Sequence, residues 1–127
     1  MRQKIIGIYT AGWENIEVVL MEGESGEFYF IPELGRNKVA RIKVGADHTQ
    51  WEKVFDVLLH EIDEYVMSSM GFRFKPTQNI NNSHDDYAFI MTHTQFTEKS
   101  ARVAEFISDA SLDVYKAWKV WKKASRP

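Results

Sequence analysis

The sequence predicts that residues 1–127 form a single α+β domain, in which a small antiparallel sheet is followed by a core helix and by one or two C-terminal helices. Short β-branched and aromatic runs, separated by glycine-containing turns, fill the first third of the chain and are typical of strands. After residue 46 the apolar residues recur at intervals of three and four, which is typical of helices that bury one face. The length of 127 residues fits one domain with its own core.

The first third contains four predicted strands, which cover Lys4–Tyr9, Ile16–Met21, Glu27–Ile31 and Lys38–Val44. Residues 22–26 and 32–37 separate the later strands and are rich in residues that stop strands. Their close spacing favours an antiparallel meander. Arg41 and Lys43 alternate with apolar neighbours, as expected of a strand with one solvent-exposed face.

A core helix is predicted over about residues 48–70. Asp47 is a candidate N-cap, with Gln50 three residues later to complete a capping box, and Gly71 follows at the position where a helix C-terminus favours glycine. Between these signals, the apolar residues at helical spacing are Trp51, Val54, Phe55, Leu58, Ile62, Tyr65 and Val66. This stripe predicts a helix that packs against the sheet.

The second half of the chain predicts a short strand, a polar loop and further helix. Phe72 and Phe74 alternate as in a strand, and an Asn-rich loop follows. Ser83 and Asp86 form a second capping signature, which favours a helix from there on, although Tyr87–Met91 also fits a strand. A last amphipathic helix is predicted over Leu112–Lys123.

The composition excludes several classes of function. A net charge of −2 supplies no global basic field, so there is no strong nucleic-acid signal. With no cysteine, disulfides, thiolate zinc sites and thiol nucleophiles are excluded, and any metal must be held by His, Asp or Glu. No apolar window reaches the roughly 20 residues of a membrane span, and the N-terminus lacks the pattern of a signal peptide. We therefore expect a cytoplasmic protein without membrane attachment.

The helix segment His60-Glu61-Ile62-Asp63-Glu64 concentrates the candidate chemistry. Residues four apart on a helix lie on the same side, so His60 and Glu64 can bind one metal ion together. Carboxylate oxygen is an accepted zinc ligand beside histidine nitrogen. Glu61 follows the first ligand directly, where a general base could take a proton from metal-bound water.

With the preceding Val57-Leu58-Leu59, this segment resembles the active helix of zincin-type metallopeptidases and their H-E-x-x-H motif, especially the small degenerate forms carried by phages. The resemblance covers roughly residues 38–94, and it departs from the family where Glu64 replaces the second histidine. It implies a zincin-like fold and zinc-dependent hydrolysis of a peptide-like bond.

A third zinc ligand would have to come from elsewhere in the chain. His93 is the first choice, because the apolar stripe around it turns it toward the interior. His84 is the second choice, and Asp86 could orient the His93 imidazole or replace it as a ligand. Tyr65 or Tyr87 is a candidate for stabilising an oxyanion.

A different interpretation needs no site at all. The apolar stripe centres near Leu58 and Ile62, whereas His60 and Glu64 lie to the other side, as on a solvent-exposed helix face. Likewise, His93 could be a core histidine with one polar partner.

The protein would then be a non-catalytic interaction or inhibitor protein of the phage type. It would bind a protein partner through the sheet edge or through its C-terminal helix, which carries lysines with Trp118 and Trp121. Aromatic residues at helical spacing are also typical of a core, and buried Trp118 and Trp121 would support that interpretation.

Overall fold

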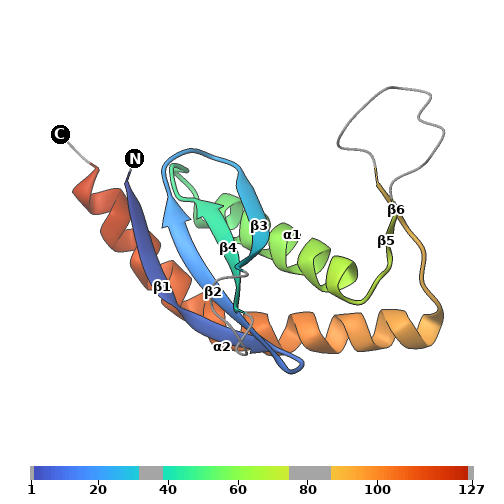
Figure 1. The fold of residues 1–127 in the computed structure, drawn as a ribbon. Helices are drawn as coiled ribbons and strands as arrows, with labels where there is room; N and C mark the ends of the chain where they lie inside the picture. Colours follow the sequence, from blue (N-terminus) through green and yellow to red (C-terminus); the bar gives the residue numbers. More distant parts are fainter. Residues whose placement is uncertain (1, 32–38, 75–86, 126–127) are drawn as a thin grey trace.

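The computed structural model describes residues 2–31, 39–74 and 87–125 (Figure 1). Its elements are β1 (Gln3–Ala11), β2 (Glu14–Met21), β3 (Gly26–Ile31), β4 (Val39–Gly45), α1 (Trp51–Ser69), β5 (Arg73–Phe74), β6 (Ala88–Phe89) and α2 (His93–Ala124). The α+β class and the four N-terminal strands predicted from the sequence are confirmed. The second capping signature, Ser83 with Asp86, lies outside the described residues, as does His84.

The main sheet is mixed, so the predicted antiparallel meander is wrong in its topology. The strand order is β1-β2-β4-β3: the β1–β2 and β3–β4 pairs are antiparallel, whereas β2 and β4 run parallel. The two central strands are those with the most buried apolar side chains. These are Ile16, Val18 and Leu20 on β2, and Ala40, Ile42 and Val44 on β4. Strand β3, which carries exposed Glu27 and Phe30, takes the edge instead.

Both helices cover the same face of this sheet (Figure 1). Helix α1 contacts β3 and β4, α2 contacts β1, and the two helices contact each other. One continuous core joins the inner side chains of β2 and β4 to those of α1 and α2. The domain therefore has two layers, one of strands and one of helices.

The opposite face of the sheet carries a row of charged and polar side chains. Arg41 forms an ion pair with Glu17 at 2.6 Å and donates a hydrogen bond to the Tyr29 hydroxyl at 3.1 Å. Lys43 lies 3.8 Å from Glu27. The predicted alternation of Arg41 and Lys43 with buried residues is confirmed.

Helix α1 begins without the predicted Asp47 cap. Gln50 is the N-cap residue, and its side chain makes no capping hydrogen bond. Asp47 instead accepts hydrogen bonds from the backbone N–H of Gly23 at 2.7 Å and from the indole of Trp121 at 3.1 Å. This carboxylate joins the β2–β3 turn to α2, and these two donors hold its pKa below the ordinary value. At the other end, Gly71 has a φ of +81°, which agrees with the predicted glycine after the helix.

Helix α2 is one helix of 32 residues, so of the one or two C-terminal helices predicted the structure has one, and it begins later than the second capping signature predicted. Thr92 caps it: its hydroxyl accepts from the Gln95 N–H, and the Gln95 side chain accepts from the Thr92 N–H. The strand alternative is confirmed for Ala88–Phe89, which pairs with β5. The N-terminal part of α2 extends past the end of the main sheet (Figure 1).

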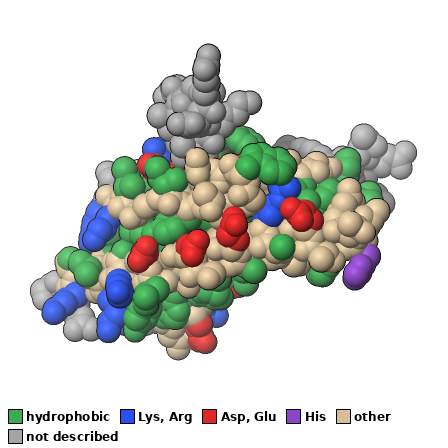
Figure 2. Space-filling view, turned by 90° about the horizontal axis from the view of Figure 1, so that it is seen from below, with side chains coloured by type: hydrophobic (Ala, Val, Ile, Leu, Met, Phe, Trp, Pro, Cys, Tyr) green, Lys and Arg blue, Asp and Glu red, His purple; other side chains and the backbone are tan. Residues whose placement is uncertain are grey.

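The aromatic residues at the end of α2 belong to the core. Trp118 and Trp121 are 5% and 2% exposed, so they are not available to a partner. Figure 2 shows basic side chains gathered at the end of the molecule where α2 ends, and acidic side chains between hydrophobic ones along the middle of this face. On this part of α2 the accessible side chains include Lys116, Lys119 and Lys123, together with Leu112 and Val120, which are each 57% exposed.

Among the described residues, none of the helices combines the length and the apolar character that crossing a bilayer requires.

Replacement of Phe106 tests the two-layer core. Phe106 is fully buried and meets the Tyr9 ring edge-on at a centroid distance of 6.0 Å. Phe106→Ala should lower the free energy of unfolding by about 3–5 kcal/mol, measured by urea denaturation with tryptophan fluorescence. The control is Leu112→Ala on the exposed side of the same helix. This variant should change the free energy of unfolding by less than about 0.5 kcal/mol. Equal losses in the two variants would contradict the packing described.

Candidate functional site

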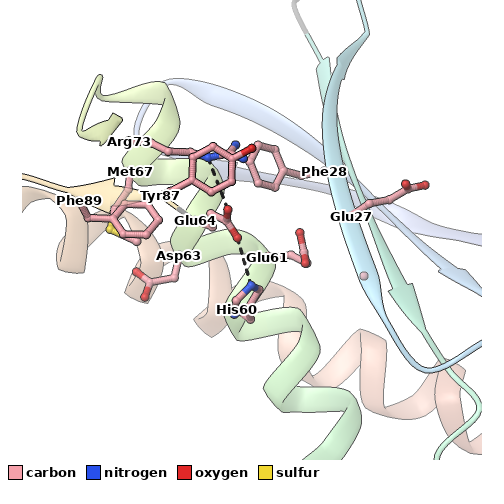
Figure 3. Close-up of a pocket in the computed structure, with 11 residues that line it drawn as sticks. Glu27, Phe28, His60, Glu61, Asp63, Glu64, Met67, Arg73, Tyr87 and Phe89 are labelled. Carbon is pink, nitrogen blue, oxygen red and sulfur yellow. Dashed lines mark ion pairs between the residues drawn. The ribbon is translucent and has the colours of Figure 1, made fainter. Parts of the chain in front are cut away.

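A pocket of about 700 Å³ lies between α1 and the edge strand β3, and β5, Tyr87 and β6 bound it on a third side (Figure 3). Helix α1 contributes His60, Glu61, Asp63 and Glu64, which are the polar residues of the predicted site segment. The solvent-exposed interpretation holds for His60, whose side chain is 67% exposed, but not for Glu61 and Glu64, which are 7% and 18% exposed and line the pocket. A volume of this size is in the range of pockets that bind ligands.

The pocket floor depends on a close approach of β3 to α1 at Gly26. A Cβ atom at this position would lie 2.7 Å from Val57 Cγ1 and 2.8 Å from Glu61 Cγ. Any larger residue would force Val57, Glu61 or the strand itself to shift. The absence of a side chain at Gly26 thus allows Glu61 to lie against the strand.

Glu61 is the buried charged residue of the described structure, with 7% of its surface exposed. Its side chain points from α1 toward β3 (Figure 3). Burial raises the pKa of its carboxyl above the ordinary 4.5; nearby Glu64 and Glu27 raise it further, while His60 and Arg73 oppose the shift. Within the described part of the chain, no group forms an ion pair with this carboxylate, and none donates a hydrogen bond to it.

Glu64 stands between two basic groups. Its Oε2 lies 3.1 Å from Nε2 of His60, and its Oε1 lies 3.5 Å from Nε of Arg73. The Arg73 guanidinium is stacked on the Tyr87 ring, with its central carbon 3.7 Å from the ring centroid, and lies 5.3 Å from the Phe28 centroid. These aromatic rings hold the guanidinium in place, so that the Arg73 cation stays beside Glu64.

The other two carboxylates of the pocket are also matched by cations. Asp63 forms an ion pair with Lys99 of α2 at 2.9 Å, and Glu27 lies 3.8 Å from Lys43. The Glu27 side chain points away from the pocket (Figure 3). Glu61 is therefore the one carboxylate of the pocket that lacks a cation among the described residues.

The three predicted zinc ligands are not brought together. His60 and Glu64 are adjacent, as their spacing predicted, and Glu61 lies in the same pocket. His93, however, is exposed as the first residue of α2 and does not line the pocket. It is not turned inward because the helix begins at His93 itself, beyond the end of the sheet, and not ten residues earlier.

The described residues therefore do not complete a zinc site. They contain no cluster of three or more His, Cys, Asp or Glu residues placed to hold a metal ion. The two alternatives, His84 and Asp86, lie outside the described residues. Arg73 beside Glu64 also opposes a second cation electrostatically. Zinc binding remains a prediction.

The two tyrosines considered for an oxyanion have different surroundings. Tyr65 donates a hydrogen bond to Glu14, which also accepts one from Ser69, and this joins α1 to the start of β2. Tyr87 lines the pocket and lies against Arg73. Of the two, Tyr87 is the one that faces the pocket.

Sequence reasoning missed Arg73 and Gly26. Arg73 stands between Phe72 and Phe74, and this alternation was a signal that its side chain leaves the strand on the opposite side from theirs. Gly26 was interpreted as a turn residue, although it begins β3. The sequence contains no signal that Gly26 approaches Glu61, because the two residues are 35 positions apart.

Comparison of the chain with protein-family models, with curated proteins and with solved structures gives no match. The resemblance to zincins consequently rests on the motif around His60 and Glu61 alone.

The raised pKa of Glu61 predicts a pH-dependent cost to stability. The folded state binds the proton more tightly than the unfolded state, so this contribution to stability is present below about pH 4.5 and is lost as the pH rises through the folded-state pKa. Glu61→Gln removes the effect, because an amide does not ionise. The variant should therefore gain stability relative to the wild type between pH 4 and pH 8, measured by urea denaturation at each pH.

The matched control is Glu24→Gln, at an exposed turn residue. The difference in the free energy of unfolding between Glu24→Gln and the wild type should show no comparable dependence on pH. A Glu61→Gln variant that loses stability relative to the wild type as the pH rises would contradict the burial of an unpaired carboxylate.

Proposed function

We propose that this protein is a binding module, which takes a segment of a protein partner along the edge strand β3 and over the adjacent pocket. The observation that carries this proposal is the position of the pocket directly beside an edge strand. In the described sheet β3 pairs with β4 alone, so the backbone groups on its other edge have no strand partner. Such an edge pairs readily with an extended segment of another chain.

The side chains of the pocket support recognition over catalysis. Phe28, Met67 and Phe89 supply apolar wall, which can pack against a partner side chain. Glu64 already interacts with Arg73 and His60, so it is not free to act as a base or as a metal ligand without rearrangement. A module that binds a partner needs only shape, apolar surface and a few polar groups.

Zinc-dependent hydrolysis is the second candidate function. It is supported by the placement of His60, Glu61 and Glu64 in one pocket. The raised pKa of the Glu61 carboxyl is also common for residues that act as acids or bases in catalysis. This function requires a third zinc donor beside His60 and Glu64, which is His93, His84 or Asp86 in our prediction. It also requires Arg73 to leave Glu64.

The binding function is tested with a displayed random-peptide library selected on the purified protein. Peptides that bind should shift the backbone amide signals of β3 in NMR spectra, because they pair with its edge. A Val120→Asp variant, altered on the exposed surface of α2, should bind the same peptides within about twofold. If no peptide is selected, or if the selected peptides shift signals only on α2, the proposed function is wrong.

The metal function makes a separate prediction. If zinc is held by His60, equilibrium dialysis should give one zinc ion per chain, and His60→Ala should weaken binding more than about tenfold. Glu61→Gln should retain the metal and abolish cleavage of a peptide library. A wild-type protein that remains metal-free at micromolar zinc would exclude this candidate and leave the binding module.

A further inference from the structure

We infer that the partner segment places a basic side chain, lysine or arginine, in this pocket, with its charged head group on the carboxylate of Glu61. This inference rests on the proposed binding function and names the chemistry that the pocket recognises. It assigns to Glu61 the role of a counter-ion for a ligand, where the motif around it suggested a base.

The charges of the pocket support a cation. Its four carboxylates are Glu27, Glu61, Asp63 and Glu64, and its immediate cations are Lys43, Lys99 and Arg73. Each of these cations pairs with one carboxylate, which leaves Glu61 without a cation among the residues that the structure describes. A buried carboxylate without a partner is costly, and a basic group from outside is the partner that removes this cost.

Arg73 does not fill this role from within the protein. Its guanidinium is fixed on the Tyr87 ring at 3.7 Å and faces Glu64. The arginine thus balances Glu64 and leaves Glu61 for a ligand.

The surroundings of Glu61 fit the shape of a basic side chain. Lysine and arginine combine an apolar stem with a charged end. The apolar wall of Phe28, Met67 and Phe89 can pack against the stem, while Glu61 lies deep between α1 and β3 and can meet the end. A carboxylate or a phosphate would instead be placed against an unmatched negative charge.

The edge strand determines how such a side chain arrives. Gly26, where an added Cβ would lie 2.8 Å from Glu61 Cγ, is the first residue of β3. A segment that pairs along β3 therefore passes the mouth of the pocket and can direct one side chain into it, since side chains alternate between the faces of a strand. A basic residue in an extended peptide is thus favoured over a free amine.

The test compares matched peptides from the selection. The selected peptides should share a lysine or arginine at one position. Its replacement by norleucine or citrulline, which are uncharged and of similar length, should weaken binding about ten- to hundredfold. Glu61→Gln should abolish the difference between charged and uncharged peptides, whereas Glu24→Gln should leave it unchanged, measured by isothermal titration calorimetry.

Three outcomes decide the inference. Peptides that bind along β3 without a preferred basic residue would overturn it and leave the proposed function standing. If peptides fail but n-butylammonium shifts the signals around Glu61 in the wild type and not in Glu61→Gln, the proposed peptide binding is overturned. The cation site at Glu61 is then upheld, with a small amine and not a peptide as its ligand. If neither n-butylammonium nor any peptide binds, both the inference and the proposed function are overturned.

Discussion

The packing of both helices against one face of the sheet is the constraint from which the site follows. Helix α1 turns Leu58 and Ile62 toward the inner face of β4, where both are fully buried. Because α1 also contacts β3 at the sheet edge, the side of the helix next to this stripe meets a strand and is not left in water. Glu61 lies on that side, one turn from each of the two apolar residues Leu58 and Tyr65.

The pairing of carboxylates with cations then determines which charged group of the pocket is left for a ligand. A helix face with this many acidic groups would ordinarily be solvated. Here Lys99 of α2 and Arg73 of β5 reach Asp63 and Glu64, and His60 meets Glu64 from the preceding turn of α1. The arrangement neutralises every carboxylate of the pocket except Glu61 within the described structure. A buried group left without a partner is more informative about a ligand than the satisfied groups around it, because its burial opposes folding until a ligand arrives.

The motif His60-Glu61-Ile62-Asp63-Glu64 shows what spacing on a helix can and cannot establish. Helical geometry alone placed His60 beside Glu64, and the two atoms are within ion-pair distance. A metal site needs a third donor from a distant part of the chain, and the same geometry says nothing about where that donor lies. In the described structure the group that reaches Glu64 is the guanidinium of Arg73, a cation in place of a further ligand.

The sequence by itself determined the class of the fold and, to within a few residues, the four strands of the main sheet and α1, because each depends on local periodicity and on turn residues. It also determined which side chains of α1 share a face. The burial of Trp118 and Trp121, which the sequence left open, was decided by the packing of α2. The tertiary structure decided the insertion of β4 between β2 and β3, the cap of α1, the exposed start of α2 at His93, and the meeting of Gly26 and Arg73 with the acidic side of α1. These features depend on contacts between segments far apart in the chain. Such contacts are stabilised by the burial of both segments together, and they produce no periodic pattern in the sequence.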